Sequence, residues 1–302
     1  MEDLTQTLRW NFRVRMSRLV SVLFWLCALS PVCAAGTIRF APLPMASLEH
    51  MTREYLPFLD YLEKQTGQTF ELAYHASYET LLDALSAGQV DLAYLGPLPY
   101  VALTERSHNM QPVVQFLDAQ GESNYTCALV HFADQPLTLI HPDRIQRFAL
   151  TQPLSTCGYL MVEAYLQAQG ESLENEQHEY TYVGSHEDVA LKVILGQYDV
   201  GGLKTQIAQR YHHLGLRVID ETPPMPGFVL VANTDTLDSA ITDQIRMALL
   251  ELKPLENPSD AEVVRGWSAN LKYGAIRVDE GLFDPVRQQW RQLKVDLVGA
   301  GQ

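Results

Sequence analysis

The sequence has little positive charge and few cysteines. Its 302 residues include 22 Lys and Arg against 36 Asp and Glu, a formal net charge of −14, and four cysteines. Nucleic acids and anionic membrane surfaces bind clustered Lys and Arg, so the charge balance argues against both as partners. Apolar residues make up 47% of the chain, an ordinary share that argues against a disordered, collagen-like or coiled-coil protein. The length is enough for one large domain or two lobes.

Metal-binding patterns are missing as well. The sequence contains neither His-Glu-x-x-His nor a pair of Cys-x-x-Cys motifs, which are familiar zinc signatures. His212 and His213 are adjacent, a spacing that does not place both side chains on one face of a helix or strand. We therefore predict no metal site and no cofactor.

A largely apolar run is found near the N-terminus, at residues 19–29. Four arginines precede it and small residues follow at 34–35, which is the order of a secretory signal peptide. The run is too short for a stable membrane span, which needs about 20 apolar residues. No later segment is long and apolar enough to be one. We predict that the mature protein is exported, soluble and periplasmic.

The predicted signal peptide is residues 1–35. We expect cleavage after Ala35, or one residue earlier, and Met16 is an alternative start to Met1. Cys33 occupies the place of a lipoprotein cysteine, but Val32 is a poor residue before one, so we predict no lipid anchor. Loss of residues 1–35 removes four Arg and two acidic residues and leaves a net charge of −16.

Cys127 and Cys157 remain in the mature chain. In an oxidising compartment they can form a disulfide. The alternative is that both are small, buried apolar residues. Their spacing alone does not decide, because it does not place their Cα atoms within bonding range.

Predicted strands and helices alternate along the chain. Strands are expected at 37–41, 70–74, 90–95, 125–130, 148–151 and 180–183, and helices at 48–66, 78–87, 158–168 and 186–195. The tail at 241–297 is predicted to be mainly helical, with breaks near Pro254, Pro258 and Gly274. This alternation indicates an α/β fold with largely parallel sheets.

Two segments match at a fixed offset of 108 residues. Ser-Tyr-Glu at 77–79 and Gly-Gln-Val-Asp at 88–91 parallel Ser-His-Glu at 185–187 and Gly-Gln-Tyr-Asp at 196–199. The pattern indicates two similar α/β lobes, although helix–Gly–strand is also common in unrelated α/β proteins. Tyr78 and His186 hold equivalent positions near helix N-termini, so in facing lobes both side chains would reach one cleft.

A candidate anion site begins at Ser155. Ser155, Thr156, Cys157 and Gly158 follow a strand and open a helix, where free backbone N–H groups bind an anion without Lys or Arg. The alternative is an ordinary Ser/Thr helix cap. His186 can likewise donate a hydrogen bond to an oxyanion or simply cap its helix.

Tyr100 follows a Gly-Pro-Leu-Pro turn at 96–99. The turn ends a strand, and it is predicted to direct Tyr100 off the C-terminal edge of the sheet, where open α/β sheets bind ligands.

We predict that the protein is not an enzyme. Ser155 with His186 and Asp188 can be drawn as a triad, and Cys157 with His186 as a thiol pair. However, no Gly-x-Ser-x-Gly motif surrounds Ser155.

Three stretches carry a family resemblance: GQVDLAYLGP at 88–97 with Tyr100, STCGYL at 155–160, and GSH at 184–186. From about residue 39 to about residue 233 the chain resembles the periplasmic substrate-binding proteins of phosphonate, phosphite and phosphate ABC transporters. The resemblance implies a two-lobed, type II periplasmic binding protein fold. Each lobe would hold a mixed, mainly parallel sheet flanked by helices, and the ligand would lie in the cleft between the lobes. It also implies ligand-binding roles for Tyr78, Tyr100, Ser155, Thr156, Cys157 and His186.

The sequence departs from the family pattern at three positions. The third residue of the Ser-Thr-Ser loop is Cys157 here, a weaker donor whose backbone N–H can still serve. Family members that hold an aminoethyl group use two carboxylates, in segments that here read Leu-Lys-Thr-Gln at 203–206 and Pro-Gly-Phe at 226–228. We therefore predict a compact tetrahedral oxyanion without an ammonium group, such as phosphite, phosphate, a small alkylphosphonate or a sulfur oxyanion.

The predicted function is capture of this oxyanion between two lobes and its delivery to an ABC permease by a monomeric protein. The alternative is a periplasmic sensing module that docks on a separate sensor kinase. Lobe 1 is expected at 36–120 plus 225–302 and lobe 2 at 121–224, with crossovers near 118–124 and 221–227. The negative net charge does not exclude an anionic ligand, because backbone amides act within a few ångströms whereas surface charges are screened over about 8 Å.

Overall fold

The computed structural model describes residues 36–133 and 145–300. The predicted signal peptide, with its cleavage site and Cys33, lies outside these residues. Residues Thr37–Gln302 form one compact unit. Within the described ranges, no helix combines the length and the apolar character needed to cross a membrane.

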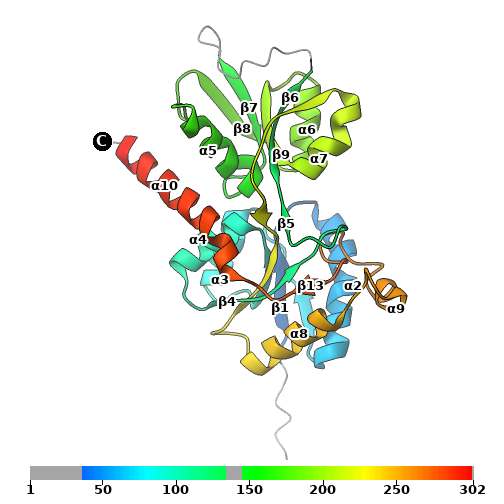
Figure 1. The fold of residues 1–302 in the computed structure, drawn as a ribbon. Coiled ribbons are helices and arrows are strands. Elements are labelled where there is room, and N and C mark those ends of the chain that lie inside the picture. Colours follow the sequence, from blue (N-terminus) through cyan, green and yellow to red (C-terminus); the bar gives the residue numbers. More distant parts are fainter. Residues whose placement is uncertain (1–35, 134–144, 301–302) are drawn as a thin grey trace, which may run out of the picture. The chain divides into compact units, whose positions relative to one another are not determined.

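One sheet has six strands in the order β13-β4-β12-β3-β1-β2. Its helices include α2, α3, α4 and α8, shown with this sheet in the lower part of Figure 1. The strands are β1 (Ile38–Pro42), β2 (Phe70–Leu72), β3 (Leu92–Leu95), β4 (Met110–Phe116), β12 (Val229–Asn233) and β13 (Ala275–Ile276), and the helices are α2 (Leu48–Thr66), α3 (Tyr78–Ser86), α4 (Pro97–Arg106) and α8 (Ser239–Glu251).

The second sheet has five strands in the order β10-β6-β9-β7-β8. It lies in the upper part of Figure 1 with α5, α6 and α7. The strands are β6 (Cys127–Phe132), β7 (Gln146–Leu150), β8 (His178–Tyr182), β9 (Val200–Lys204) and β10 (Leu216–Glu221), and the helices are η1 (Thr156–Leu160, π-helical), α5 (Met161–Ala168), α6 (His186–Ile194), α7 (Thr205–Tyr211) and η2 (His212–Leu214).

Helix α2 shows how local sequence sets these elements. The Ser47 side chain accepts a hydrogen bond from the backbone N–H of His50 and caps the N-terminus, and Gly67 ends the helix with a φ of 68°. The apolar side chains of one helix face are buried at Met51 and at four further positions down to Leu62. Leu48 at the first position is the exception, because its side chain is 49% exposed.

Both sheets are mixed, with less parallel pairing than expected. Among the described strands, parallel pairs are β1–β2, β1–β3, β7–β8 and β7–β9. The strands β12, β4 and β13 pair antiparallel in the first sheet, and β6 and β10 do so in the second. Each sheet is therefore an α/β half extended by antiparallel strands.

The chain passes between the two sheets through a pair of short strands. β5 (Asn124–Tyr125) pairs antiparallel with β11 (Met225–Pro226) in a separate two-stranded sheet. The predicted single strand at 125–130 is thus two strands, because β5 pairs with β11 whereas β6 joins the five-stranded sheet.

The repeat extends to an ion pair that the sequence analysis did not single out. The Arg39 Nε donates to Asp91 at 2.9 Å, and the Arg147 Nε donates to Asp199 at 3.3 Å. In each pair the arginine backbone N–H also donates to the same carboxylate, at 2.8 and 2.9 Å. The pairs join β1 to the residue before β3 in the first half, and β7 to the residue before β9 in the second. The two halves therefore share the same structural bonds as well as the same sequence pattern.

The tail is largely helical, as predicted, with one unexpected strand. It contains α8, α9 (Pro258–Val263), η3 (Glu280–Phe283) and α10 (Asp284–Ala300). Between them β13 pairs with β4, directly after the predicted break at Gly274, whose φ is 100°.

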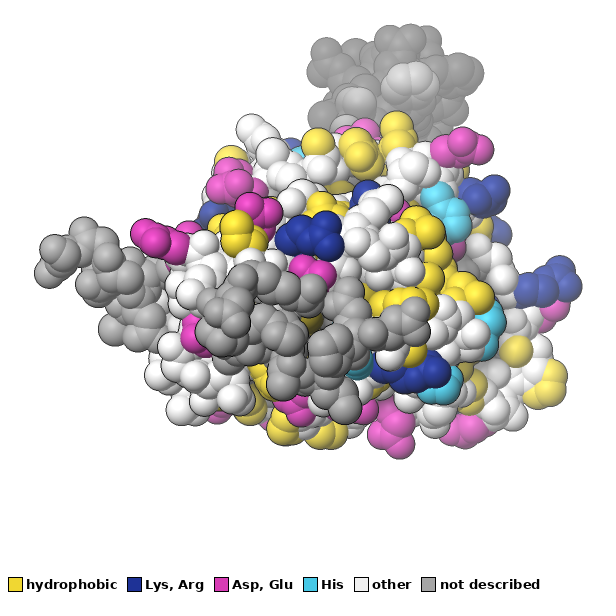
Figure 2. Space-filling view, turned by 90° about the horizontal axis from the view of Figure 1, so that it is seen from above, with side chains coloured by type: hydrophobic (Ala, Val, Ile, Leu, Met, Phe, Trp, Pro, Cys, Tyr) yellow, Lys and Arg dark blue, Asp and Glu magenta, His cyan; other side chains and the backbone are white. Residues whose placement is uncertain are grey.

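The surface carries both signs of charge. On the face shown in Figure 2, Asp and Glu side chains are interspersed with Lys, Arg and apolar side chains. The negative charge on this face is spread out rather than gathered in one patch.

Candidate functional site

A small cavity lies where residues of both halves of the chain and of the two crossovers meet. Measured for the centre of a water-sized sphere, its free volume is about 10 Å³, which is room for about one water molecule. The cavity is lined by residues from three parts of the chain: Leu43, Met45, Tyr78, Gly96 and Pro99 from the first part, Tyr125 and Phe228 from the crossovers, and Ser155, Thr156, Cys157, His186 and Lys204 from the second part. Helices α3, α6 and η1 all begin at this cavity, so their N-terminal N–H groups converge there.

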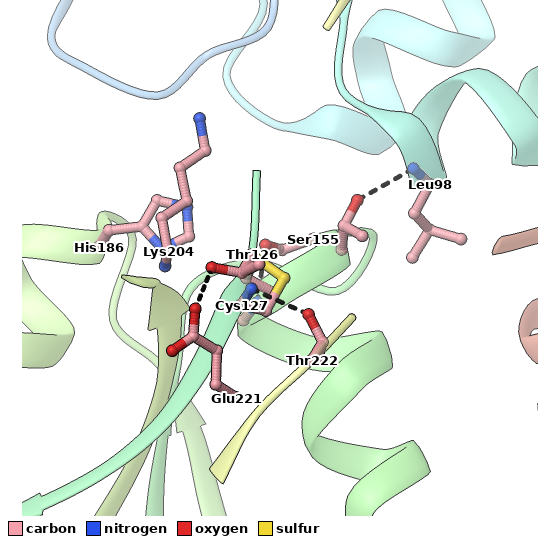
Figure 3. The surroundings of a disulfide bond; sticks show 11 residues. Leu98, Thr126, Cys127, Ser155, His186, Lys204, Glu221 and Thr222 are labelled. Carbon is pink, nitrogen blue, oxygen red and sulfur yellow. Dashed lines mark hydrogen bonds between the residues drawn. A yellow bond between two sulfur atoms is a disulfide. The ribbon is translucent and has the colours of Figure 1, made fainter. Parts of the chain in front are cut away.

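The Ser155 loop is held by its own hydroxyls. The Ser155 Oγ accepts a hydrogen bond from the Gly158 N–H at 3.0 Å and caps η1. The Thr156 Oγ1 accepts one from the Leu98 N–H at 3.0 Å, a buried contact drawn in Figure 3. Each hydroxyl therefore keeps its own proton, which it can donate to a bound oxyanion.

Glycine is required where the loop passes the sheet. A Cβ on Gly158 would lie 1.9 Å from the Thr151 Oγ1, and a Cβ on Gly202 would lie 2.6 Å from the Cys157 carbonyl oxygen. Both distances are far below contact, so these two glycines allow the loop to lie against β9.

Cys157 is bonded to Cys127, with a Cα–Cα distance of 5.0 Å. The bond joins the turn η1 to strand β6, whose Cys127 pairs in register with Lys204 of β9. The Cys157 sulfur is therefore not a hydrogen-bond donor, and this residue offers an anion only its backbone N–H.

Tyr78 is the first residue of α3. Ser77 caps this helix, and its side chain and the Thr80 side chain form a capping box. The Tyr78 side chain is buried, and burial raises the pKa of its phenol well above the ordinary value. The hydroxyl thus stays protonated and able to donate.

His186 holds the equivalent place at the start of α6. Its Nδ1 lies 3.4 Å from the backbone N–H of Lys204, which donates to it and so assigns the ring proton to Nε2. Burial, with a smaller contribution from the Lys204 charge, lowers the pKa of His186 to about 3. The ring is therefore neutral near pH 7 and offers one Nε2–H donor.

The structure does not bring Tyr100 to the cavity. Its hydroxyl donates to Glu280 at 3.2 Å, and its ring packs against Phe283 with centroids 4.9 Å apart. Helix α4 begins at Pro97, so Tyr100 lies one turn into a helix and its side chain projects toward η3. The Gly-Pro turn thus directs Tyr100 toward Glu280 in this structure, and its ligand-binding role stays a prediction.

Seven of the lining residues were not predicted as site residues, and three of these, Tyr125, Lys204 and Phe228, lie against one another. The Lys204 ammonium lies 4.1 Å from the ring centroid of Phe228 and 4.9 Å from that of Tyr125. Burial lowers the pKa of Lys204 to about 8. The sequence marked Lys204 and Phe228 only as departures from the family pattern, and nothing in their spacing placed them together.

Comparison with known proteins shows the family of this chain. A family model described as "ABC transporter, phosphonate, periplasmic substrate-binding protein" matches residues 40–279. The chain belongs to this family. The resemblance predicted from the three motifs is confirmed, and with it the assignment to a family of substrate-binding transport proteins.

Two curated members of the family are similar in sequence. The phosphate-import protein PhnD of Mycolicibacterium smegmatis is 23% identical over 270 residues, which cover 83% of this chain and 84% of that protein. The phosphonates-binding periplasmic protein of Escherichia coli is 26% identical over 206 residues, or 64% of this chain and 60% of that protein.

Solved structures of phosphonate-binding proteins show the fold. PhnD1 of Prochlorococcus marinus, solved in complex with methylphosphonate, has a TM-score of 0.72 and 19% identity and covers 85% of this chain and 98% of its own. A phosphonate transporter binding protein of Pseudomonas aeruginosa has a TM-score of 0.70 and 22% identity, with 84% and 85% covered. The two-lobed, type II periplasmic binding protein fold of the family is thereby confirmed for this chain.

Proposed function

We propose that this substrate-binding protein captures a compact tetrahedral oxyanion without an ammonium group and delivers it to an ABC permease. Phosphonates with small substituents, phosphite and phosphate are the candidate ligands. The observation that carries the proposal is the convergence of three helix beginnings and their side-chain donors on one small cavity.

The donors suit an anion with three or four oxygens. They are the hydroxyls of Tyr78, Ser155 and Thr156, the Nε2–H of His186, and the backbone N–H of Cys157 at the start of η1. Hydrogen bonds to a charged group contribute about 1.5–3 kcal/mol each, and the helix N-termini add a favourable dipole. A few such bonds are enough for micromolar affinity or better.

The cavity does not suit a ligand that carries an amine. None of the described residues that line it is Asp or Glu, so an aminoalkyl phosphonate would lose the hydration of its ammonium without gaining a carboxylate partner.

The bonding pattern of the loop argues against catalysis. The Ser155 Oγ is engaged by the Gly158 N–H, and the Cys157 sulfur is bonded to Cys127. Neither group is paired with His186 as a nucleophile and base would be. We propose binding as the whole activity of this site.

We propose that lobe 1 comprises 36–120 and 225–302, that lobe 2 comprises 121–224, and that β5 and β11 form the hinge. Outside the crossovers, the hydrogen bonds that join the parts include one from the Leu98 N–H to Thr156 Oγ1 and one from the Gln152 Nε2 to the Pro44 carbonyl at 3.2 Å. Closure around a ligand is the usual behaviour of such a fold and would present both lobes to a permease.

Export through cleavage after Ala35 belongs to the same proposal and is tested by N-terminal sequencing of the secreted protein.

Isothermal titration tests the ligand proposal. The mature protein is titrated with phosphite, phosphate, methylphosphonate, 2-aminoethylphosphonate and sulfate. We expect micromolar or tighter binding of at least one phosphorus oxyanion, and much weaker binding of 2-aminoethylphosphonate. Failure to bind any of the oxyanions would refute the proposal.

The site assignment has its own control. Ser155→Ala combined with His186→Ala should weaken binding at least a hundredfold, because two donors to the anion are lost. Ser86→Ala combined with His213→Ala removes the same groups at exposed positions outside the cavity and should leave affinity unchanged. Equal affinity in both double variants would show that the ligand binds elsewhere.

A further inference from the structure

Lys204 places a positive charge in a cavity that otherwise offers neutral donors. No other Lys or Arg is found among the described residues that line it. In the described part of the chain, no carboxylate lies within ion-pair distance of the Lys204 ammonium. Glu187, the nearest acidic influence on it, forms its own ion pair with Arg210 at 3.3 Å.

The Lys204 ammonium is held between aromatic rings instead. It lies 4.1 Å from the ring centroid of Phe228 and 4.9 Å from that of Tyr125. Figure 3 shows the side chain beside His186, with the ammonium pointing away from the disulfide. Aromatic faces attract a cation but do not neutralise it, so this half-buried charge still lacks a counter-ion.

The backbone keeps Lys204 in place from two sides. Its N–H donates to the His186 Nδ1 at 3.4 Å, and it pairs in register with Cys127, the residue that is bonded to the Ser155 loop through Cys157. Lys204 is therefore connected both to the start of α6, at His186, and to the Ser155 loop, the two elements that supply anion donors. A ligand that contacts His186 and the loop lies within reach of the lysine.

We propose that Lys204 is the residue that sets the charge of the ligand, so that the site selects a dianionic oxyanion over a monoanion of the same shape. This inference rests on the proposed function and deepens it. A fixed positive charge interacts about twice as strongly with a dianion as with a monoanion at the same distance. The same charge repels an ammonium substituent.

Two ligands of one shape separate charge from fit. Methylphosphonate and methanesulfonate are both tetrahedral and carry one methyl group, but only the phosphonate ionises twice. We expect the wild-type mature protein near neutral pH to bind methylphosphonate at least tenfold more tightly. Lys204→Met, which keeps most of the length of the side chain and removes its charge, should lower methylphosphonate affinity about ten- to a hundredfold. It should change methanesulfonate affinity much less, so the ratio of the two affinities falls.

Further variants separate charge from packing. Phe228→Leu removes a ring from the lysine but keeps the charge, and should preserve most of the affinity ratio. Lys204→Gln repeats the test if Lys204→Met does not fold, as judged by its thermal unfolding. A variant that only disturbed the fold would lower the affinity for both ligands by the same factor.

The outcomes distinguish the two proposals. A wild-type protein that binds no phosphorus oxyanion overturns the proposed function together with this inference. A wild-type protein that binds methylphosphonate, while Lys204→Met and Lys204→Gln keep the wild-type affinity ratio, overturns the inference about Lys204 alone. A ratio that falls in both lysine variants and holds in Phe228→Leu supports it.

Discussion

At the scale of single residues, the protonation state of His186 decides what the cavity offers an anion. The ring touches the Lys204 backbone, and the charged or titratable groups around it are Lys204, Glu187, Tyr78 and Tyr125. Burial and the Lys204 charge lower the pKa of His186 to about 3, from an ordinary value of 6.5. The ring thus acts as a neutral donor rather than as a cation.

The lowered pKa of His186 predicts acid sensitivity of the ligand-free protein. Between pH 6.5 and 3 the unfolded chain binds a proton at His186 that the folded protein does not. The contribution of His186 to the free energy of unfolding is therefore complete above pH 6.5 and is lost as the pH falls toward 3. Urea unfolding of wild type and His186→Gln across this range should show a shallower pH dependence in the variant. Superimposable profiles would mean that the histidine protonates normally in the folded protein.

Gly158 predicts a second residue-scale effect. A Cβ at this position would overlap the Thr151 side chain, with a separation of 1.9 Å from Oγ1. Gly158→Ala should lower the free energy of unfolding by about 1–3 kcal/mol and weaken oxyanion binding, because the loop must shift. Gly266→Ala is the matched control, since its nearest neighbour would be Pro57 at 3.5 Å, an ordinary contact. Equal stability and affinity of the two variants would contradict this account.

At the scale of elements, the site is made by helix beginnings that the repeat places in matching positions. Ser77 caps α3 and Ser185 caps α6, each through its own side chain. The following residue, Tyr78 or His186, then projects into the cavity from its half of the chain. The third beginning, η1, is capped by Ser155, which matches Ser47 at the start of α2 at the same offset, and η1 is held in addition by the disulfide.

The disulfide predicts a link between redox state and binding. Cys127 and Cys157 are 30 residues apart, and a cross-link over a loop of this size stabilises a fold by about 3 kcal/mol. Reduction of the mature protein should lower its thermal unfolding temperature and weaken oxyanion binding, because the η1 turn is no longer tied to β6. The Cys127→Ser/Cys157→Ser variant should show both losses already and should not respond to the reductant. A wild-type affinity that is unchanged by complete reduction would show that the turn holds its shape alone.

At the scale of the whole molecule, affinity depends on how firmly the two sheets are held together over the ligand. The Gln152 Nε2 donates to the Pro44 carbonyl at 3.2 Å across this boundary, and Gln152 does not line the cavity. Gln152→Ala should therefore weaken oxyanion binding about two- to tenfold, the value of one ordinary hydrogen bond. The loss should appear in the dissociation rate, measured by stopped-flow fluorescence. Gln209→Ala, on the exposed face of α7, is the control, and an equal effect of both changes would argue against a closing contact.

Sequence patterns located the parts of the site that depend on local structure. The caps at Ser77, Ser155 and Ser185 are written in the residues that follow them, and the repeat indicated that Tyr78 and His186 are equivalent. For Tyr100 the sequence did not indicate that α4, which begins at Pro97, turns the side chain toward Glu280. No local sequence pattern indicated that Tyr125, Lys204 and Phe228 line the cavity together.

The sequence by itself determined the α/β alternation, the two related halves, the helix beginnings proposed to bind an anion, and the family. Those features depend on neighbours within a few turns of the chain or on a repeat. Only the tertiary structure decided that Tyr125, Lys204 and Phe228 meet in one wall and that Cys127 reaches Cys157. These contacts join residues that the crossovers and strand register bring together from distant positions, and no local pattern specifies such a distance. The sequence has few positive charges, and the structure places one of them, Lys204, in the cavity, where we propose that it selects the charge of the ligand.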